Sequence, residues 1–236
     1  MFVGGVIHFT LIDFPGRIAC NVFTVGCTFR CPFCYNKDLV LGNVSGTDVN
    51  AFFQWLESRK GKIEGVVVTG GEPTIQKDLP AFLERIKGMG FDTKLDTNGA
   101  DPAMLEKLLE LDLLDYVAMD VKAPFDAEKF SRVTGVKERV EDVMKKVAES
   151  VDILLESGIP YEFRTTVVPT LHREEDIRGM GEIIRGARLW ALQGFRPEQN
   201  LIDPKMKSVK PYPPKVMQRF ADIAREYVAR VELRGV

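Results

Sequence analysis

The chain has 236 residues, of which 45% are hydrophobic and 28% are charged, and its formal net charge is -2. This composition is ordinary for a globular protein, and a chain of this length can bury a sizeable core in one domain. The near-neutral charge argues against a general binder of nucleic acids or of membrane surfaces. No apolar run reaches the roughly 18 residues that a membrane-spanning helix needs.

The N-terminal stretch lacks the features of an export signal. It has no basic region, and Asp13 interrupts its apolar residues. Three of the four cysteines cluster at Cys27, Cys31 and Cys34. Clustered cysteines in a chain without an export signal indicate a reducing compartment and metal chemistry. We therefore expect a cytoplasmic location and no structural disulfides.

Short β-branched runs alternate with helical runs along the chain. Residues 18–25 predict the first strand, and residues 47–59 predict a helix that is capped by Thr47. Further strands are predicted at 64–70, 91–97, 115–122, 161–168 and 188–195, and helices at 78–88, from Asp101-Pro102 onward, at 139–157 and at 173–187. About six βα units predict a parallel sheet with right-handed crossovers. Six units close only part of a barrel, since a complete one has eight.

The predicted organisation is a single domain without a linker or an internal repeat. Residues 1–17 form an N-terminal hairpin or lip, residues 18–195 form the βα core, and residues 196–236 form a C-terminal loop, helix and tail. The stretch 194–215 is rich in Pro, Lys and Gln, which predicts a long surface loop before the final helix.

Polar residues gather at the predicted strand ends. The first four strands end in Gly26-Cys27, TGGEPT (69–74), DTNG (96–99) and DVKAP (120–124), and the fifth and sixth carry Arg164 and Gln193. Parallel βα folds bind their ligands at the carboxyl ends of the strands. The sequence therefore predicts an active site along this edge of the sheet.

The three clustered cysteines have the spacing C-x3-C-x2-C. Thiolates bind zinc, copper(I) or iron–sulfur clusters. A [4Fe–4S] cluster normally takes four cysteines, so three would leave one iron with an open position. The spacing favours such a cluster.

A zinc site remains the alternative, and it needs a fourth ligand. Cys20, His8 and His172 are the candidates for it. Side chains alternate along a strand, so an unbroken first strand points Cys20 away from the face of Cys27. We therefore expect Cys20 to be a small buried residue.

The cysteine motif, with Phe33 just before the third cysteine, resembles that of the radical S-adenosylmethionine (radical SAM) enzymes. The later motifs match in order, so the resemblance covers nearly the whole chain and implies a partial (β/α)6 barrel whose parallel sheet is open on one side. Within the superfamily, six motifs resemble those of glycyl-radical-enzyme activating enzymes: TLIDFPGR (10–17), CYN (34–36), TGGEPT (69–74), LDTNG (95–99), DVK (120–122) and RTTV (164–167). The greatest likeness is to activating proteins of anaerobic ribonucleotide reductase, followed by pyruvate formate-lyase activating enzymes.

This resemblance implies the reaction. Cys27, Cys31 and Cys34 would bind one [4Fe–4S] cluster, which reduces SAM to methionine and a 5′-deoxyadenosyl radical. The radical would take a hydrogen from a backbone glycine of a partner glycyl radical enzyme. Because the chain has cysteines for a single cluster, it would need an external electron donor such as ferredoxin or flavodoxin. No membrane or nucleic-acid partner is expected.

The resemblance also implies a set of SAM-binding residues: Phe33, Asn36, Gly70, Gly71, Glu72, Asp96, Asp120, Lys122, Arg164 and Gln193. Phe33 would bound the adenine, Asn36 would contact the ribose, and the Gly-Gly-Glu turn would meet the methionine part. Lys122 and Arg164 would neutralise the carboxylate or hold the ribose. Gln193 would lie near the adenine or ribose.

Asp96 and Asp120 match positions that take part in a monovalent-cation and SAM-carboxylate site in the activating enzymes. Tyr35 stands where relatives often have histidine, which leaves the role of that position open. Each of these residues also has a plain structural interpretation. The glycines could form only a tight turn, and the two aspartates could cap helices or face solvent.

Two other functions remain open from the sequence. One is a radical SAM enzyme that acts on a small molecule or nucleoside, as carboxy-deazaguanine synthases do. The other is a zinc-binding module without catalytic activity. The segment 8–17 also has two interpretations, either a hairpin that covers one end of the barrel or a lip whose Asp13 and Arg17 face the partner's loop.

Overall fold

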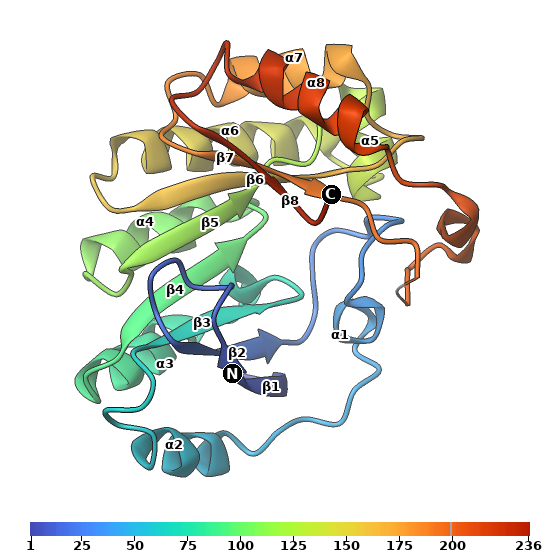
Figure 1. Ribbon diagram of the computed structural model, residues 1–236. Helices are drawn as coiled ribbons and strands as arrows, with labels where there is room; N and C mark the ends of the chain where they lie inside the picture. Colours follow the sequence, from blue (N-terminus) through green and yellow to red (C-terminus); the bar gives the residue numbers. More distant parts are fainter. Residues whose placement is uncertain (199) are drawn as a thin grey trace. The chain divides into compact units, whose positions relative to one another are not determined.

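The computed structural model describes residues 1–198 and 200–236, and Figure 1 shows its course. Eight strands form one sheet whose order, β1 to β8, follows the sequence. The six predicted strands correspond to β2–β7, so the expected open and mostly parallel sheet is confirmed. Gln199, inside the predicted surface loop, lies outside the described residues.

The chain divides into two compact units, which are described in turn. The first contains residues 1–28, 38–97 and 103–118, and the second contains residues 29–37, 98–102 and 119–236. The division falls within the cysteine loop and within one strand of the sheet.

The first unit contains four strands and the start of a fifth. The elements are β1 (Val3–Thr10), β2 (Ala19–Thr24), β3 (Gly65–Gly70), β4 (Asp92–Thr97), α2 (Val49–Glu57), a 3-10 turn (Pro73–Ile75), α3 (Leu79–Gly88) and most of α4 (Pro102–Glu110). The short helix α1 (Lys37–Leu41) begins in the second unit and continues in the first. β1 is antiparallel to β2, while β2, β3 and β4 run parallel.

β3, which pairs with β2 on one side and β4 on the other, has an apolar sequence on both faces. Val66, Val67 and Val68 of β3 are fully buried, as expected for a strand covered on both sides. α2 begins one residue later than predicted, because the Asp48 carboxylate, and not Thr47, accepts a hydrogen bond from the N–H of Asn50 at 2.8 Å.

The second unit begins at the end of β5 (Tyr116–Asp120). It continues through α5 (Ala127–Thr134), α6 (Val140–Glu156), β6 (Tyr161–Val167), α7 (Glu174–Ile183), β7 (Trp190–Gly194), a 3-10 turn (Pro204–Ser208), α8 (Pro214–Ala224) and β8 (Val231–Arg234). β6, β7 and β8 run parallel, and α7 lies beside α8 (Figure 1). The sequence pattern predicted no helix at α5 and an irregular tail where β8 lies.

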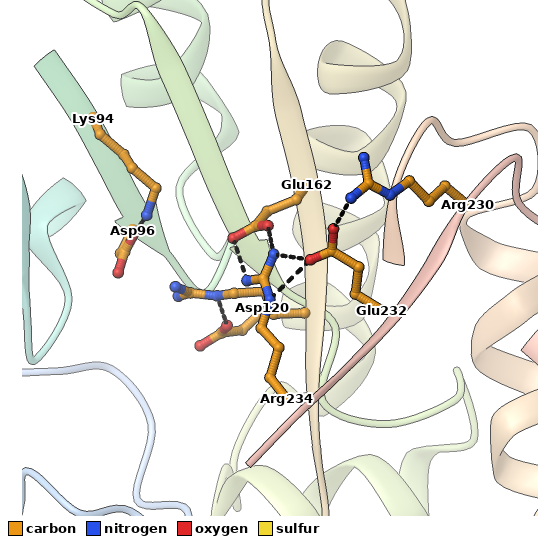
Figure 2. A network of polar contacts seen from close by, with 8 residues as sticks. Lys94, Asp96, Asp120, Glu162, Arg230, Glu232 and Arg234 are labelled. Atoms are coloured by element: carbon orange, nitrogen blue, oxygen red, sulfur yellow. Dashed lines mark hydrogen bonds and ion pairs between the residues drawn. The ribbon is translucent and has the colours of Figure 1, made fainter. Parts of the chain in front are cut away.

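Within the second unit, a network of ion pairs connects β8 to β6 (Figure 2). Arg234 of β8 donates to both oxygens of Glu162 on β6, at 3.1 and 2.6 Å. The Glu162 side chain is only 2% exposed, so its charge depends on this bidentate partner. Among the described residues, no helix is long and apolar enough to cross a membrane.

Candidate active site

The predicted site residues are divided between the two units. Cys27, the Gly-Gly-Glu turn and Asp96 belong to the first unit. Cys31, Cys34 and the later polar residues belong to the second. Each group has its own local scaffold.

In the first unit, the Gly-Gly-Glu turn is hydrogen-bonded to the chain that leads into Cys27. The N–H of Gly71 donates to the carbonyl of Thr24 at 2.9 Å, and the N–H of Glu72 donates to the carbonyl of Gly26 at 2.8 Å. β2 and β3 are parallel neighbours, so their carboxyl ends lie side by side and allow these bonds.

Gly71 is required by this packing. A Cβ atom at Gly71 would collide with the carbonyl oxygen of Gly26, one residue before Cys27. The sequence interpretation assigned the glycines to close approach of a ligand. The structure shows that the backbone approaching Gly71 is the chain's own, so any side chain there would displace the start of the cysteine loop.

The Glu72 carboxylate holds the turn in place. It is 1% exposed, and its Oε1 accepts hydrogen bonds from the N–H and the hydroxyl of Thr74, at 3.1 and 2.7 Å. The same oxygen accepts from the hydroxyl of Thr97, at the end of β4, at 2.7 Å. Glu72 therefore connects the ends of β3 and β4.

Asp96 lies on β4 two residues after Lys94, which no sequence motif singled out. The ammonium of Lys94 donates to Oδ1 of Asp96, and the two side chains share one face of the strand (Figure 2). Lys94 is 1% exposed. The ammonium of Lys94 thus contacts one oxygen of the carboxylate at which the sequence predicted a monovalent cation.

In the second unit, three contacts fix the rest of the cysteine loop. The N–H of Arg30 donates to the carbonyl of Thr134 at 2.7 Å, and the N–H of Asp203 donates to the carbonyl of Pro32 at 2.9 Å. The hydroxyl of Tyr35 accepts from the N–H of Arg196 at 2.8 Å. Tyr35, whose role the sequence left open, thus anchors the loop to the segment after β7.

The surroundings of the Cys34 thiol have opposing effects on its pKa. Burial raises its pKa, while the backbone N–H of Asn36 and the charge of Lys122 act in the opposite direction. Phe33 is buried, and its ring centroid lies 6.4 Å from that of His172. Asn36 is half-buried. These surroundings favour a thiolate only when a positive ligand replaces the lost solvation.

Asp120, Lys122 and Arg164 form a compact ion-pair group at the ends of β5 and β6. Lys122 Nζ lies 2.9 Å from one Asp120 oxygen, and Arg164 Nε lies 2.9 Å from the other. Burial raises the pKa of Asp120, but the attraction of Arg164 and Lys122 outweighs it and holds the pKa at about 2. Burial lowers the pKa of Lys122, whereas Asp120 and Cys31 raise it, with a net increase. Gln193 is half-buried on β7, paired in register with Thr166.

The candidate fourth ligands for zinc are otherwise engaged. Both ring nitrogens of His172 contact backbone groups, and His8 packs its ring edge-on against Trp55 at 4.5 Å. Cys20 is fully buried on β2, and burial raises the pKa of its thiol to about 12. His172 is thus occupied by backbone contacts, and Cys20 is held as a buried thiol.

The donor set fits an iron–sulfur cluster. Within the described residues, no disulfide joins any of the four cysteines. No three His, Cys or carboxylate side chains there are arranged around a single metal ion. That arrangement is not what a [4Fe–4S] cluster needs, because each cysteine binds a different iron. Three thiols on one loop, with Lys122 near two of them, suit an anionic cluster.

The comparison with known families is decisive. The family model of the radical SAM superfamily matches residues 21–185, well over half of the chain. The chain belongs to the radical SAM superfamily. Family membership implies one [4Fe–4S] cluster and SAM as cofactors, which agrees with the donor set.

The relatives of this radical SAM protein specify the kind of enzyme. It is 32% identical over 235 residues to the Methanocaldococcus jannaschii protein named "Putative glycyl-radical enzyme activating enzyme MJ1227", covering 99% of this chain and 96% of the relative. It is also 32% identical over 190 residues to the pyruvate formate-lyase-activating enzyme of Streptococcus mutans, covering 75% and 69%. The chain is therefore an activating enzyme of glycyl radical enzymes, and its protein partner is an enzyme of that class.

Solved structures show the same fold at low identity. The structure of SuiB from Streptococcus suis, bound to the precursor peptide SuiA, gives a TM-score of 0.63 at 15% identity. That alignment covers 89% of this chain and 47% of SuiB, so the radical SAM protein spans about half of SuiB's length. An archaeal TYW1 gives a TM-score of 0.54 at 14% identity, covering 89% and 72%.

Proposed function

We propose that this radical SAM protein activates anaerobic ribonucleotide reductase by removing a hydrogen from one backbone glycine of that enzyme. The supporting observation is the ordered set of motifs, above all TLIDFPGR at residues 10–17 before the cysteine loop. The membership of the chain among glycyl-radical-enzyme activating enzymes gives the reaction class, and these motifs favour this particular partner.

In this proposal, Cys27, Cys31 and Cys34 hold the cluster. The cluster and SAM together supply a 5′-deoxyadenosyl radical as the hydrogen acceptor. The chain itself holds the cysteine loop in place. Hydrogen bonds from the Gly-Gly-Glu turn to Thr24 and Gly26 fix the approach to Cys27. The hydrogen bond from Arg196 to Tyr35 fixes the other end of the loop.

The polar residues of the second unit have the charges that SAM requires. Arg164 and Lys122 carry two positive charges against the single charge of Asp120, which leaves a surplus for the SAM carboxylate. Phe33, Asn36 and Gln193 are proposed to contact the adenine and ribose. In the first unit, Gly70, Gly71 and Glu72 present backbone carbonyls to the ammonium of SAM, because the Oε1 of Glu72 is already engaged.

We further propose a small redox protein such as ferredoxin or flavodoxin as the electron donor. The only cysteine outside the loop is Cys20, which is fully buried. Cysteines of this chain could therefore hold no second cluster, which supports a separate protein as the source of the electron.

The hairpin turn after β1 leads into the amino end of β2, whereas Cys27 follows the carboxyl end of that strand. This turn is therefore proposed as a secondary contact with the partner's surface, and not as the contact for its glycine loop. Asp13 does not face outward as the sequence suggested, because its Oδ2 accepts from Thr10 at 2.7 Å and from Asn21 at 2.6 Å. Arg17 pairs with Asp92 at 2.6 Å. The most exposed large apolar side chains are instead Leu11 at 64% and Ile12 at 86%. Apolar side chains exposed at a turn tip suit transient contact with another protein.

The test is activation of purified partner enzymes. Anaerobically reconstituted protein is incubated with a reductant, SAM and either anaerobic ribonucleotide reductase or pyruvate formate-lyase from the same organism. We expect the electron paramagnetic resonance doublet of a glycyl radical on the reductase, together with 5′-deoxyadenosine measured by chromatography. A doublet on pyruvate formate-lyase alone would transfer the assignment to that partner.

A second candidate has one observation in its favour. The chain is 27% identical over 203 residues to the 7-carboxy-7-deazaguanine synthase of Thermococcus kodakarensis, covering 77% of this chain and 76% of that enzyme. This alternative predicts that a small molecule or nucleoside raises 5′-deoxyadenosine formation without any protein partner. Turnover of such a substrate, with no radical on either partner enzyme, would favour it.

A further inference from the structure

Lys94 is the most deeply buried charged side chain of β4. It is 1% exposed, and a buried ammonium is stable only when it is paired. Its partner is Asp96, two residues along the same face of the strand. The ammonium also lies 5.7 Å from the ring centroid of Tyr116, a distance at which an aromatic face attracts a cation.

Asp92 is the third charged residue on that face of β4, and its recorded partner is Arg17, not Lys94. Its Oδ2 accepts from Arg17 Nε at 2.6 Å. The Asp96 side chain is 14% exposed, so the carboxylate is bound by Lys94 from the buried side while part of it remains accessible.

We infer that Lys94 is a built-in cation, which takes the place of the monovalent metal ion expected at Asp96 from the resemblance to other activating enzymes. A metal ion on this carboxylate would have to lie beside the ammonium and would be repelled by it. Lys94 therefore acts as a positioning residue, because it neutralises and orients Asp96 without leaving its strand.

The other acidic residue assigned to the cation is also paired with the protein's own charges. Asp120 contacts Lys122 and Arg164, both at 2.9 Å. Each of the two aspartates thus has a protein cation. Such an arrangement predicts that SAM binding by this chain needs no particular alkali cation.

The test is the cation dependence of SAM binding, and it relies on the proposed function only for the choice of SAM as ligand. Anaerobic equilibrium dialysis of the reconstituted protein measures SAM affinity in potassium, sodium or choline chloride at constant ionic strength. For the unaltered protein, we expect affinities that agree within about twofold. A loss of about tenfold in choline would overturn the inference.

Lys94→Met removes the charge but keeps an unbranched side chain. In choline its SAM affinity should fall by about tenfold, and potassium or sodium should restore most of the loss. Broadening of the thallium-205 NMR signal should appear with Lys94→Met and be absent with the unaltered protein. An affinity of Lys94→Met that equals that of the unaltered protein in all three salts would contradict the inference.

Two results separate this inference from the proposed function. If SAM does not bind at all, the proposed function fails. Thallium binding then still measures whether a cation can bind at Asp96, with and without Lys94. If Lys94→Met does not fold, Lys94→Met combined with Asp96→Asn removes both charges and should bind no thallium. The unaltered protein is a sufficient test by itself, because SAM binding that depends on potassium would contradict the inference that Lys94 replaces the metal ion.

Discussion

The Nε2 atom of His172 lies 2.8 Å from the carbonyl oxygen of Lys122, and its Nδ1 accepts a hydrogen bond from the N–H of Val168 at 2.9 Å. Because Nδ1 accepts, the proton is on Nε2, which donates to Lys122. The ring is fully buried, and burial lowers its pKa to about 4 although the bond to Lys122 acts in the opposite direction. A neutral imidazole thus fixes the backbone of a proposed SAM-binding residue.

This contact makes stability depend on pH. An unfolded histidine has a pKa of about 6.5, so between about pH 6.5 and pH 4 the unfolded chain binds a proton that the native ring does not. The free energy of unfolding, measured with urea, should fall by about 2 kcal/mol between about pH 7 and pH 5. His172→Gln should be less stable at neutral pH and should lose most of this dependence.

Asp120 provides an internal control, because it acts in a lower pH range. Its pKa falls from 3.8 to about 2 in the native state, so its stabilisation is complete above the first value and is lost toward the second. Asp120→Asn should therefore leave the change between about pH 7 and pH 5 intact. If His172→Gln keeps the full pH dependence, another group is responsible.

The cysteines should separate into two classes. Replacement of Cys27, Cys31 or Cys34 by Ala should abolish the brown colour, the iron content and SAM cleavage after anaerobic reconstitution. Cys20→Ala should keep all three and lose about 1 kcal/mol of stability, because Cys20 is a fully buried small side chain. The assignment is wrong if Cys20→Ala loses iron while Cys34→Ala retains it.

Gly71→Ala should disturb the cysteine loop directly. Its Cβ would collide with the carbonyl of Gly26, so we expect a loss of more than about 2 kcal/mol and clearly reduced iron binding. Gly88→Ala is the matched control, because that glycine lies in α3 with open space around its Cβ position. Iron content equal to that of the unaltered protein in folded Gly71→Ala would show that the turn and the loop are not coupled.

Arg234→Met should destabilise the protein by about 3 kcal/mol, because it leaves the buried Glu162 carboxylate without its bidentate partner. Arg230→Met is the control. Arg230 pairs with Glu232 in the same network (Figure 2) but is 70% exposed, so its loss should cost less than about 0.5 kcal/mol. Thermal or urea unfolding measures both. Equal effects would mean that exposure does not determine the strength of these pairs.

Leu11→Ser combined with Ile12→Ser should uncouple activation from SAM cleavage. The two exposed side chains make no cofactor contact in the proposal, so 5′-deoxyadenosine formation without the partner should change by less than about twofold. The glycyl radical signal on the partner should fall by about tenfold. Leu111→Ser, at an apolar side chain that is 53% exposed elsewhere in the first unit, should change neither. Equal losses of 5′-deoxyadenosine and of the glycyl radical would mean that the hairpin turn stabilises the fold and does not contact the partner.

The sequence alone determined the features that depend on local pattern. Alternating β-branched and helical runs gave the positions of β2–β7 to within a few residues, since burial on both faces leaves a continuous apolar run such as that of β3. The cysteine spacing and the order of the strand-end motifs identified the superfamily, because a cluster and its cofactor constrain residue types at fixed intervals.

Only the tertiary structure decided which neighbours those residues meet. Tyr35 and Arg196 are far apart in sequence, and no local pattern predicts their hydrogen bond. β8 is likewise a strand because its backbone pairs with β7, and Arg234 then reaches Glu162 on β6, although the segment alone was predicted as a tail. Lys94 stands two residues from Asp96, yet whether that face of β4 meets solvent or the interior is set by packing. A charged side chain in solvent costs little free energy, whereas the same side chain in the interior requires a partner of opposite charge. Because packing buries Lys94, it pairs with Asp96 and becomes a candidate cation for the site.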